Sequence, residues 1–333
     1  MVCEMYAEPK DMPVLRHFRL ERVAEGVYAA IAIEGAGAMG NAAIVDLGDS
    51  TLVLDTMLTP QAADDLRAAA EQLTGRLVRY VLNTHFHGDH VQGNQVFADA
   101  VIVATRRTRE LMAERTLHDI ERGQAHPEKG AEQLRKQEEE LAGEQDEARK
   151  RALAADLATW RLFDAALPAL RLPLPTLTFD TSIVLQGAQR RVEFLTIGGG
   201  HTHSDAFLYL PDDHVAVMGD LLFVKSHPWM GDGDPEEWIR ILDHVETLDL
   251  RTLVPGHGPV GTLEDCARVR QYIRDSLAAV RDAMRAGTSA DELIRQPVPT
   301  AYAAWDGSET YRWNMRFLHG YLSSTGESEA GED

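Results

Sequence analysis

The segment NTHFHGDH, residues 83–90, places three histidines and an aspartate within six consecutive positions. Histidine is the commonest metal ligand among the side chains, and carboxylates bind metals as well. Three other short motifs combine glycine with a histidine or an aspartate: GGGHTHSD (198–205), MGD (218–220) and PGHG (255–258). Because glycine lets the backbone turn tightly, such motifs can bring side chains together. The four motifs are therefore candidates for one metal site.

Each motif follows an apolar run of strand length or lies within one. β-Branched runs between Gly, Asn and Asp predict early strands at 18–23, 26–33, 41–47, 50–56, 78–83 and 101–105. Later runs predict strands at 181–186, 191–197, 206–210, 214–220 and 251–256. Helices are expected from Pro60 to about Leu73, with Thr59 as cap, from Pro235 to about Leu248, at 263–285 and near SADELI. Two strand-then-helix halves predict two sheets packed face to face, with helices outside.

Residues 106–167 interrupt this pattern with a charged segment that is poor in strand-forming residues. The stretch from Gly123 to Gly130, which contains Pro127, is expected to divide it into two helices. We interpret it as a helical insertion packed on the outside, or as a lid or an arm that contacts a second subunit. The expected organisation is a single domain over 14–322, with a C-terminal helical region at 262–322 and a disordered tail at 323–333.

The composition limits the partners. The chain has 333 residues, and 33 basic against 53 acidic residues give a net charge of −20, which is expected to repel nucleic acid and anionic membranes. The only two cysteines, Cys3 and Cys266, form no CxxC pair, which indicates a reducing compartment and excludes a thiolate zinc site. The sequence shows neither a membrane-spanning run nor a signal peptide. We expect a cytoplasmic protein that acts on a small molecule, with a homodimer as the alternative to a monomer.

The motifs HFHGDH, GHTHSD, GD and GHG, in this order, resemble the metallo-β-lactamase fold superfamily of metallo-hydrolases. The resemblance covers roughly residues 20 to 260 and implies an α/β fold, an αββα sandwich with its metals at one edge. It assigns seven metal ligands: His85, His87, Asp89, His90, His201, Asp220 and His257.

These assignments imply a chemistry. Three histidines (His85, His87 and His201) would hold a first zinc, while Asp89, His90 and His257 would hold a second. Asp220 would bridge the two ions, and Asp89 and Asp220 are the expected catalytic carboxylates. The implied cofactors are two Zn²⁺ per chain, with iron or manganese as alternatives. A metal-bridging hydroxide would then cleave an ester, thioester, lactone, amide or phosphoester bond.

Other functions stay open at this point. A mononuclear iron persulfide dioxygenase uses the same scaffold with fewer ligands, so the complete set counts against it. A β-lactamase is disfavoured because zinc β-lactamases of the family tend to have cysteine or serine where this chain has Asp220. A closed, noncatalytic zinc site is disfavoured because no cysteine takes part. A protein whose insertion blocks the pocket and abolishes catalysis is the last alternative.

Several neighbours of the motifs are candidates for substrate contact or ligand support. His203 could face the pocket as a proton donor or lie in a surface turn, and Asp205 could orient a ligand histidine or stabilise a solvated turn. Asp55 is expected to support the metal edge or a turn rather than bind metal. The residues that follow the bridging aspartate are expected to line the substrate cleft: Lys225, His227 and Trp229.

Overall fold

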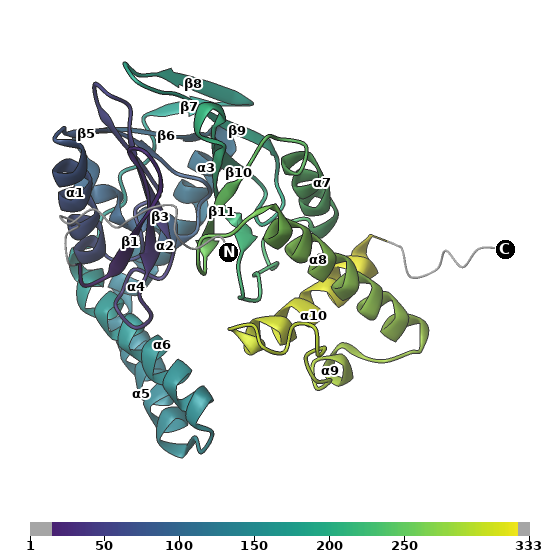
Figure 1. Ribbon diagram of the computed structural model, residues 1–333. Helices are drawn as coiled ribbons and strands as arrows, with labels where there is room; N and C mark the ends of the chain where they lie inside the picture. Colours follow the sequence, from purple (N-terminus) through teal and green to yellow (C-terminus); the bar gives the residue numbers. More distant parts are fainter. Residues whose placement is uncertain (1–14, 326–333) are drawn as a thin grey trace.

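The computed structural model describes residues 15–325 and contains two β-sheets with helices on their outer faces (Figure 1). The first sheet has the order β1-β2-β3-β4-β5-β6-β7, antiparallel from β1 to β4 and parallel from β4 to β7. Its strands are β1 (Phe18–Ala24), β2 (Val27–Ala32), β3 (Ala42–Asp46), β4 (Thr51–Leu54), β5 (Val78–Leu82), β6 (Val101–Thr105) and β7 (Leu177–Phe179). The strand β7 was not predicted from the sequence.

The second sheet has the order β12-β11-β10-β9-β8 and is antiparallel except for the parallel pair of β11 and β12. Its strands are β8 (Ser182–Gln186), β9 (Arg191–Gly198), β10 (Asp205–Leu210), β11 (Val215–Phe223) and β12 (Thr252–His257). Every residue of β11 is buried, because this strand is covered on both faces. Such a continuous apolar strand suits a sheet that has no solvent-facing side at this position.

Three apolar layers hold the sandwich together. Side chains of both sheets, among them Val45 and Leu208, form one buried cluster between the sheets. The helix α1 (Pro60–Thr74) buries Leu66 in a cluster on the outer face of the first sheet. The helices α7 (Pro235–Val245), α8 (Leu263–Arg285) and α10 (Ser308–Ser324) form the corresponding layer on the second sheet. The predicted αββα sandwich is confirmed.

The local signals in the sequence explain several helix boundaries. The Thr59 side chain accepts a hydrogen bond from Ala62 N, Pro60 is the first residue of α1, and Gly75 ends the helix at a φ of 68°. These are the expected roles of a capping threonine, an N-terminal proline and a C-terminal glycine. The prediction of a helix from Pro60 is therefore confirmed. Among residues 15–325, no helix is long and apolar enough to cross a membrane.

The insertion contains more segments than predicted. It consists of α3 (Arg106–Leu111), a π-helical turn η2 (Met112–Thr116), α4 (Leu117–Ala125), α5 (Pro127–Gly143) and α6 (Glu147–Ala166), before the short 3₁₀ turn η3 (Leu167–Ala169). The expected single second helix is in fact two, because Glu144 is extended and the Asp146 side chain caps a new helix by accepting from Arg149 N. Leu111, Met112 and Ile120 of its first half are buried against the domain. The α5–α6 hairpin extends away from the sheets (Figure 1).

The remaining elements are short. They are α2 (Gly88–Val91), η1 (Gln92–Phe97), η4 (Pro211–Asp213) and α9 (Ala290–Leu293). The helix α10 continues to Ser324, so the first two positions of the expected tail are helical. The rest of that tail from residue 326, and Cys3 at the other end, lie outside the described residues.

Candidate metal centre

The four motifs meet at one edge of the sandwich, where strands of both sheets end. The first follows β5, and α2 begins inside it, so that Asp89 and His90 lie on a helical turn. His201 lies between β9 and β10, Asp220 belongs to β11 and His257 ends β12. Residues more than 160 positions apart in the sequence thus share one small region.

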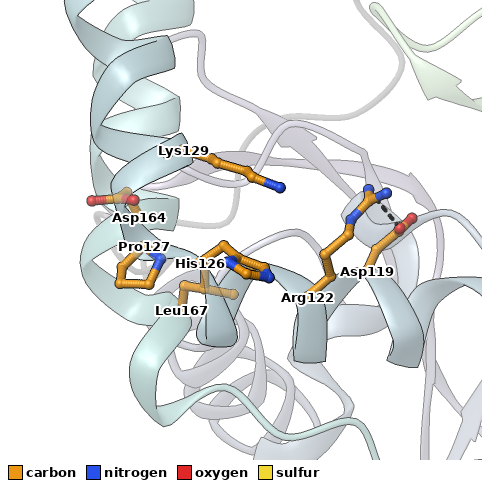
Figure 2. A pocket seen from close by; sticks show the side chains of 9 residues that line it. Asp119, Arg122, His126, Pro127, Lys129, Asp164 and Leu167 are labelled. Carbon is orange, nitrogen blue, oxygen red and sulfur yellow. Dashed lines mark ion pairs between the residues drawn. The ribbon is translucent and has the colours of Figure 1, made fainter.

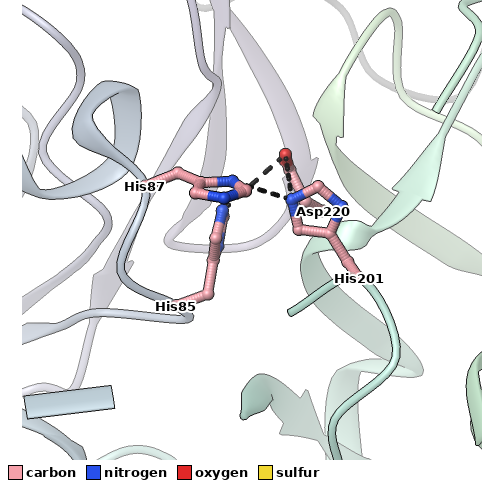
Figure 3. A group of neighbouring side chains, drawn as sticks. All are labelled: His85, His87, His201 and Asp220. Carbon is pink, nitrogen blue, oxygen red and sulfur yellow. Dashed lines mark hydrogen bonds and ion pairs between the residues drawn. The ribbon is translucent and has the colours of Figure 1, made fainter. Parts of the chain in front are cut away.

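The first group consists of His85, His87, His201 and Asp220, whose ligand atoms lie within 4.8 Å of one another. Figure 3 shows the two histidines of the first motif reaching in from one side, and His201 and Asp220 from the other. His201 Nε2 lies 3.2 Å from Asp220 Oδ2 and 2.9 Å from His87 Nδ1. His85 Nε2 lies 3.7 Å from the same Asp220 oxygen. Three imidazoles and a carboxylate therefore converge on one point.

The second group consists of Asp89, His90 and His257. Asp89 Oδ2 lies 3.4 Å from His90 Nε2 and 3.2 Å from His257 Nε2. Asp220 contacts this group too, with Oδ1 3.1 Å from His90 Nε2 and Oδ2 3.4 Å from His257 Nε2. All seven predicted ligands are thus brought together, and Asp220 lies between the two groups.

The chemistry of these atoms fits bound cations. His85 Nε2, His90 Nε2 and Asp220 Oδ1 are buried without a hydrogen-bond partner, although the last two lie only 3.1 Å apart. Buried polar atoms normally have partners, so three such atoms at one place need an explanation. Imidazole nitrogens and carboxylate oxygens suit zinc and similar divalent ions, and a metal would satisfy all three atoms.

Two histidines of the first motif have their outward nitrogen held by neighbouring side chains. Thr84 Oγ1 lies 2.9 Å from His85 Nδ1. His90 Nδ1 lies 2.9 Å from Asp55 Oδ2, and Asp55 also accepts from the backbone N and Oγ1 of Thr84, both at 2.8 Å. Asp55 is buried at a φ of 58°, and it supports the site without belonging to either group. Partners of this kind fix the ring orientation and the tautomer of a metal-binding histidine.

The other two histidines of the first group are held by the loop that follows β11. His201 Nδ1 lies 2.8 Å from the backbone oxygen of Trp229, and His87 Nε2 lies 3.1 Å from Asp232 Oδ2. Asp205 supports His201 indirectly, because it accepts from Gly200 N and from the backbone and hydroxyl of Thr202. The loop that carries His201 is thereby fixed on both sides of the ligand.

Glycine in the PGHG motif has a steric reason. A Cβ atom at Gly256 would lie 1.9 Å from Asp220 Oδ1 and 2.7 Å from the carbonyl carbon of Gly219. No larger residue fits there unless the carboxylate moves. The motif therefore both positions His257 and leaves room for the shared carboxylate.

For most ligands, the charges of neighbouring side chains shift the pKa in the direction opposite to burial. Burial disfavours the charged imidazole, but the carboxylates of Asp220 and Asp89 outweigh it and raise the pKa of His90 well above its usual value and that of His257 to about 9. Burial would raise the pKa of both carboxyls, yet the histidines hold it well below the usual range. For His85, burial and the neighbouring charge of His90 lower the pKa. Without metal, the site therefore binds protons that a cation would have to displace.

A cavity of about 540 Å³ opens beside His257. Its apolar side is formed by Ile31 and Met39 from β2 and the following loop, and by Ala152 of α6. Arg151 and three carboxylates also line it: Glu34, Asp156 and Asp306. The insertion thus forms one wall of the cavity next to the second group.

The structure places the candidates for substrate contact in different surroundings. His203 is exposed and borders a different surface depression with Arg106 and Thr181, as the surface-turn alternative requires. His227 is buried among Tyr272, Trp305 and Tyr311, where burial lowers its pKa to about 4. It packs against the C-terminal helices instead of lining the cavity beside His257.

Lys225 and Trp229 differ as well. Lys225 is exposed at a φ of 60°, and its backbone oxygen accepts from Asp306 N. Trp229 is 37% exposed, and its indole N–H lies 3.4 Å from Asp232 Oδ2, the oxygen that also contacts His87. Its backbone oxygen, which no sequence pattern indicates, makes the contact to His201.

A separate cavity of about 370 Å³ lies within the insertion, where α4, α5 and the end of α6 meet (Figure 2). Arg122 is paired with Asp119 there, and the His126 and Lys129 side chains are exposed. None of the seven predicted ligands lines it. His126 belongs to this cavity and to neither ligand group.

Residues 35–257 match the family model of the metallo-beta-lactamase superfamily. A linear primary-alkylsulfatase from Pseudomonas sp. (strain ATCC 19151) is 25% identical over 264 residues, 76% of this chain and 49% of that protein. A type 2 metallo-beta-lactamase from Bacteroides fragilis is 27% identical over 107 residues, 31% of this chain and 43% of that protein. The chain thus spans about half the length of these curated relatives or less.

A comparison with solved structures finds the same fold. The solved structure of a metallo-beta-lactamase from Pontibacter korlensis has a TM-score of 0.56 and 16% sequence identity, and the match covers 78% of this chain and 99% of that one. At this identity the likeness shows the shared fold alone.

Proposed function

The chain belongs to the metallo-beta-lactamase superfamily, and we propose that it is a hydrolase that uses two zinc ions to cleave an ester, thioester, lactone, amide or phosphoester bond of a small molecule. The observation that carries the proposal is the position of Asp220. Its carboxylate lies within 3.7 Å of a histidine nitrogen from each of the two ligand groups. A carboxylate in this position can bind two cations at once.

The residues have separate tasks in this proposal. His85, His87 and His201 would hold the first ion, whereas Asp89, His90 and His257 would hold the second. Bound divalent cations supply an acidified water and polarise the oxygen of the substrate. Asp89 and Asp220 stay ionised, because the neighbouring histidines hold their pKa values well below the usual range despite burial. As anions, the two carboxylates would offset part of the positive charge of the bound cations.

Two features support hydrolysis of a small molecule. The cavity beside His257 is large enough for a ligand of that class and has both apolar and charged walls. His257 itself is only partly buried, with 22% of its side chain exposed, so the second group is accessible from the cavity. We place the substrate there, with its scissile bond next to Asp89 and Asp220.

Sulfate-ester hydrolysis is a second candidate. It is supported by the similarity to a linear primary-alkylsulfatase across 76% of this chain, and by the apolar wall of Ile31, Met39 and Ala152, which suits an alkyl group. β-Lactam cleavage is supported only by a shorter match. A persulfide dioxygenase would need one iron, and it stays disfavoured because both ligand groups are complete.

The test combines metal analysis with a substrate panel. We expect two zinc ions per chain in protein reconstituted with zinc, and turnover of at least one ester, thioester, lactone, amide, phosphodiester or linear alkyl sulfate. The Asp220→Ala variant should keep its fold, lose one metal and lose turnover. One iron with oxygen uptake would favour the dioxygenase. Wild-type turnover in Asp220→Ala with both metals bound would contradict the proposal.

The remaining partners stay predictions. We propose a cytoplasmic location from the two cysteines, which form no CxxC pair, and the absence of nucleic-acid and membrane binding from the net charge of −20. A homodimer through the insertion is proposed as one of the roles of that segment.

A further inference from the structure

The π-helical turn η2 (Met112–Thr116) of the insertion lies directly on the segment that carries the first ligands. Thr116 Oγ1 donates a hydrogen bond of 2.6 Å to the backbone oxygen of Phe86, the residue between His85 and His87. The Arg115 guanidinium carbon lies 5.5 Å from the centre of the Phe86 ring. π-Helical turns are rare and occur frequently at functional sites, because the extra residue redirects the side chains that follow it.

Arg115 is connected to the metal centre through one carboxylate. Its guanidinium lies 2.6 Å from Asp232 Oδ1, while the other oxygen, Oδ2, lies 3.1 Å from His87 Nε2. Both oxygens of Asp232 are therefore used, one by the insertion and one by a predicted ligand. The contacts span 117 and 145 positions of the sequence.

The direction of these contacts decides which nitrogen of His87 faces the first group. Asp232, as an ionised carboxylate, only accepts hydrogen bonds, so His87 Nε2 must carry the proton. The lone pair is then on Nδ1, which lies 2.9 Å from His201 Nε2 inside the group. If the His87 ring turned away from Asp232, the Nδ1 lone pair would no longer point at the first group. Histidine–carboxylate pairs around metals commonly serve this purpose.

Asp232 has little other support. It lies in the glycine-containing turn between Trp229 and α7, and 28% of its side chain is exposed. It also accepts a long hydrogen bond of 3.4 Å from the Trp229 indole. An exposed ion pair by itself contributes little to stability, so the value of Arg115 depends on what Asp232 does for His87.

We propose that Arg115 is a positioning residue for the first metal site, through which the helical insertion holds Asp232 and thereby fixes the orientation of His87. The insertion then has two effects on the centre: α6 forms a wall of the cavity, and η2 stabilises a ligand. The inference rests on the proposed function in one respect, namely that the first group binds a metal.

The experiment compares Arg115→Ala with Arg107→Ala, a matched control in the same segment. Arg107 is similarly exposed, and within residues 15–325 its ion pairs are with Glu110 and Glu114 of the insertion. Zinc affinity is measured by chelator competition in a His257→Ala background, which removes a ligand of the second group. Arg115→Ala should weaken the first-site zinc affinity by up to about 10-fold, the lower end of what loss of a direct partner of a ligand costs, because Arg115 acts through Asp232. Arg107→Ala should leave it unchanged, and Arg115→Lys should restore part of the loss.

A second measurement needs no metal. In metal-free protein with ¹⁵N-labelled histidine, the His87 Nε2–H signal should be present in the wild type and in Arg107→Ala, but lost or broadened in Arg115→Ala. If Arg115→Ala binds zinc like the control and keeps this signal, the inference is wrong while the hydrolase proposal stands. If the wild type binds no zinc, the hydrolase proposal fails, and the NMR signal alone decides whether Arg115 positions His87.

Discussion

Replacing Asp55 by asparagine should selectively weaken the second metal site. Asp55 is 1% exposed, and its carboxylate accepts hydrogen bonds from Thr84 N, Thr84 Oγ1 and His90 Nδ1. The bond to Asp55 holds a proton on His90 Nδ1, so a metal that displaces the proton from Nε2, 3.1 Å from Asp220 Oδ1, would meet a lone pair there. The asparagine amide would keep the bond from Thr84 N but would present an NH₂ group to His90. The imidazole would then have to accept at Nδ1, which moves its proton to Nε2.

The expected loss of metal affinity at the second site follows from this change of tautomer at His90. A metal needs the Nε2 lone pair, so binding would force two N–H groups against each other at the former Asp55 contact. The variant thus loses a hydrogen bond to a charged group, about 1.5 to 3 kcal/mol. At about 1.4 kcal/mol per factor of ten, the second-site affinity should fall by roughly 10- to 150-fold. The first group should be affected much less, since Asp55 contacts none of its histidines directly.

The assay is metal content after dialysis against a chelator of graded strength, with affinity measured by competition. A matched control is Asp65→Asn, because Asp65 in α1 likewise pairs with a histidine, Oδ2 lying 2.7 Å from His17 Nδ1, and neither residue belongs to a ligand group. Asp55→Asn should retain one zinc where the wild type and the control retain two. Equal retention of both metals in all three proteins would refute the tautomer argument. Loss of the fold in Asp55→Asn would be visible in its circular dichroism and would point to a structural role instead.

Three further outcomes are expected. In metal-free protein, Asp220 and Asp89 outweigh burial and raise the pKa of His257 from 6.5 to about 9, so protonation of His257 stabilises the folded protein by at most about 3 kcal/mol below about pH 6.5. This contribution is lost as the pH rises from about 6.5 through about 9. Thermal unfolding in chelator should therefore show a Tm that falls over this pH range, and a constant Tm would contradict the assignment. Ala152→Trp should fill the cavity beside His257 and reduce turnover several-fold or more with both metals retained, whereas Ala154→Trp on the same helix should not, and equal turnover would show that substrate binds elsewhere. Gly256→Ala should displace the Asp220 carboxylate, lower the free energy of unfolding by about 1 to 3 kcal/mol and reduce the amount of bound metal. Calorimetry and metal analysis would detect both effects, and a variant with normal metal content would disprove the steric argument.

The fold could be predicted well where local signals are strong. Apolar runs of strand length bounded by glycine or asparagine gave most strands, and the cap at Thr59 with Pro60 gave the start of α1. The three-residue strand β7 was missed because it is too short to show a period. The α5–α6 boundary was missed because Gly143 to Asp146 is surrounded by good helix formers, although Asp146 is itself a helix-capping residue.

The candidate site divides in the same way. The four motifs stand in the sequence itself, and the family resemblance that they carry was enough to name the seven candidate ligands and their order. Only the tertiary structure decided how these ligands are supported. Asp232 meets His87 across 145 positions, and Arg115 meets Asp232 across 117, so neither contact leaves a periodic or local trace. The tertiary structure also decided that His227 packs against the C-terminal helices and that His203 lies on the surface. Such contacts form only when distant segments of the chain meet at one edge of the sandwich. The packing of the two sheets and of the insertion decides where those segments meet, and the local sequence around each residue does not.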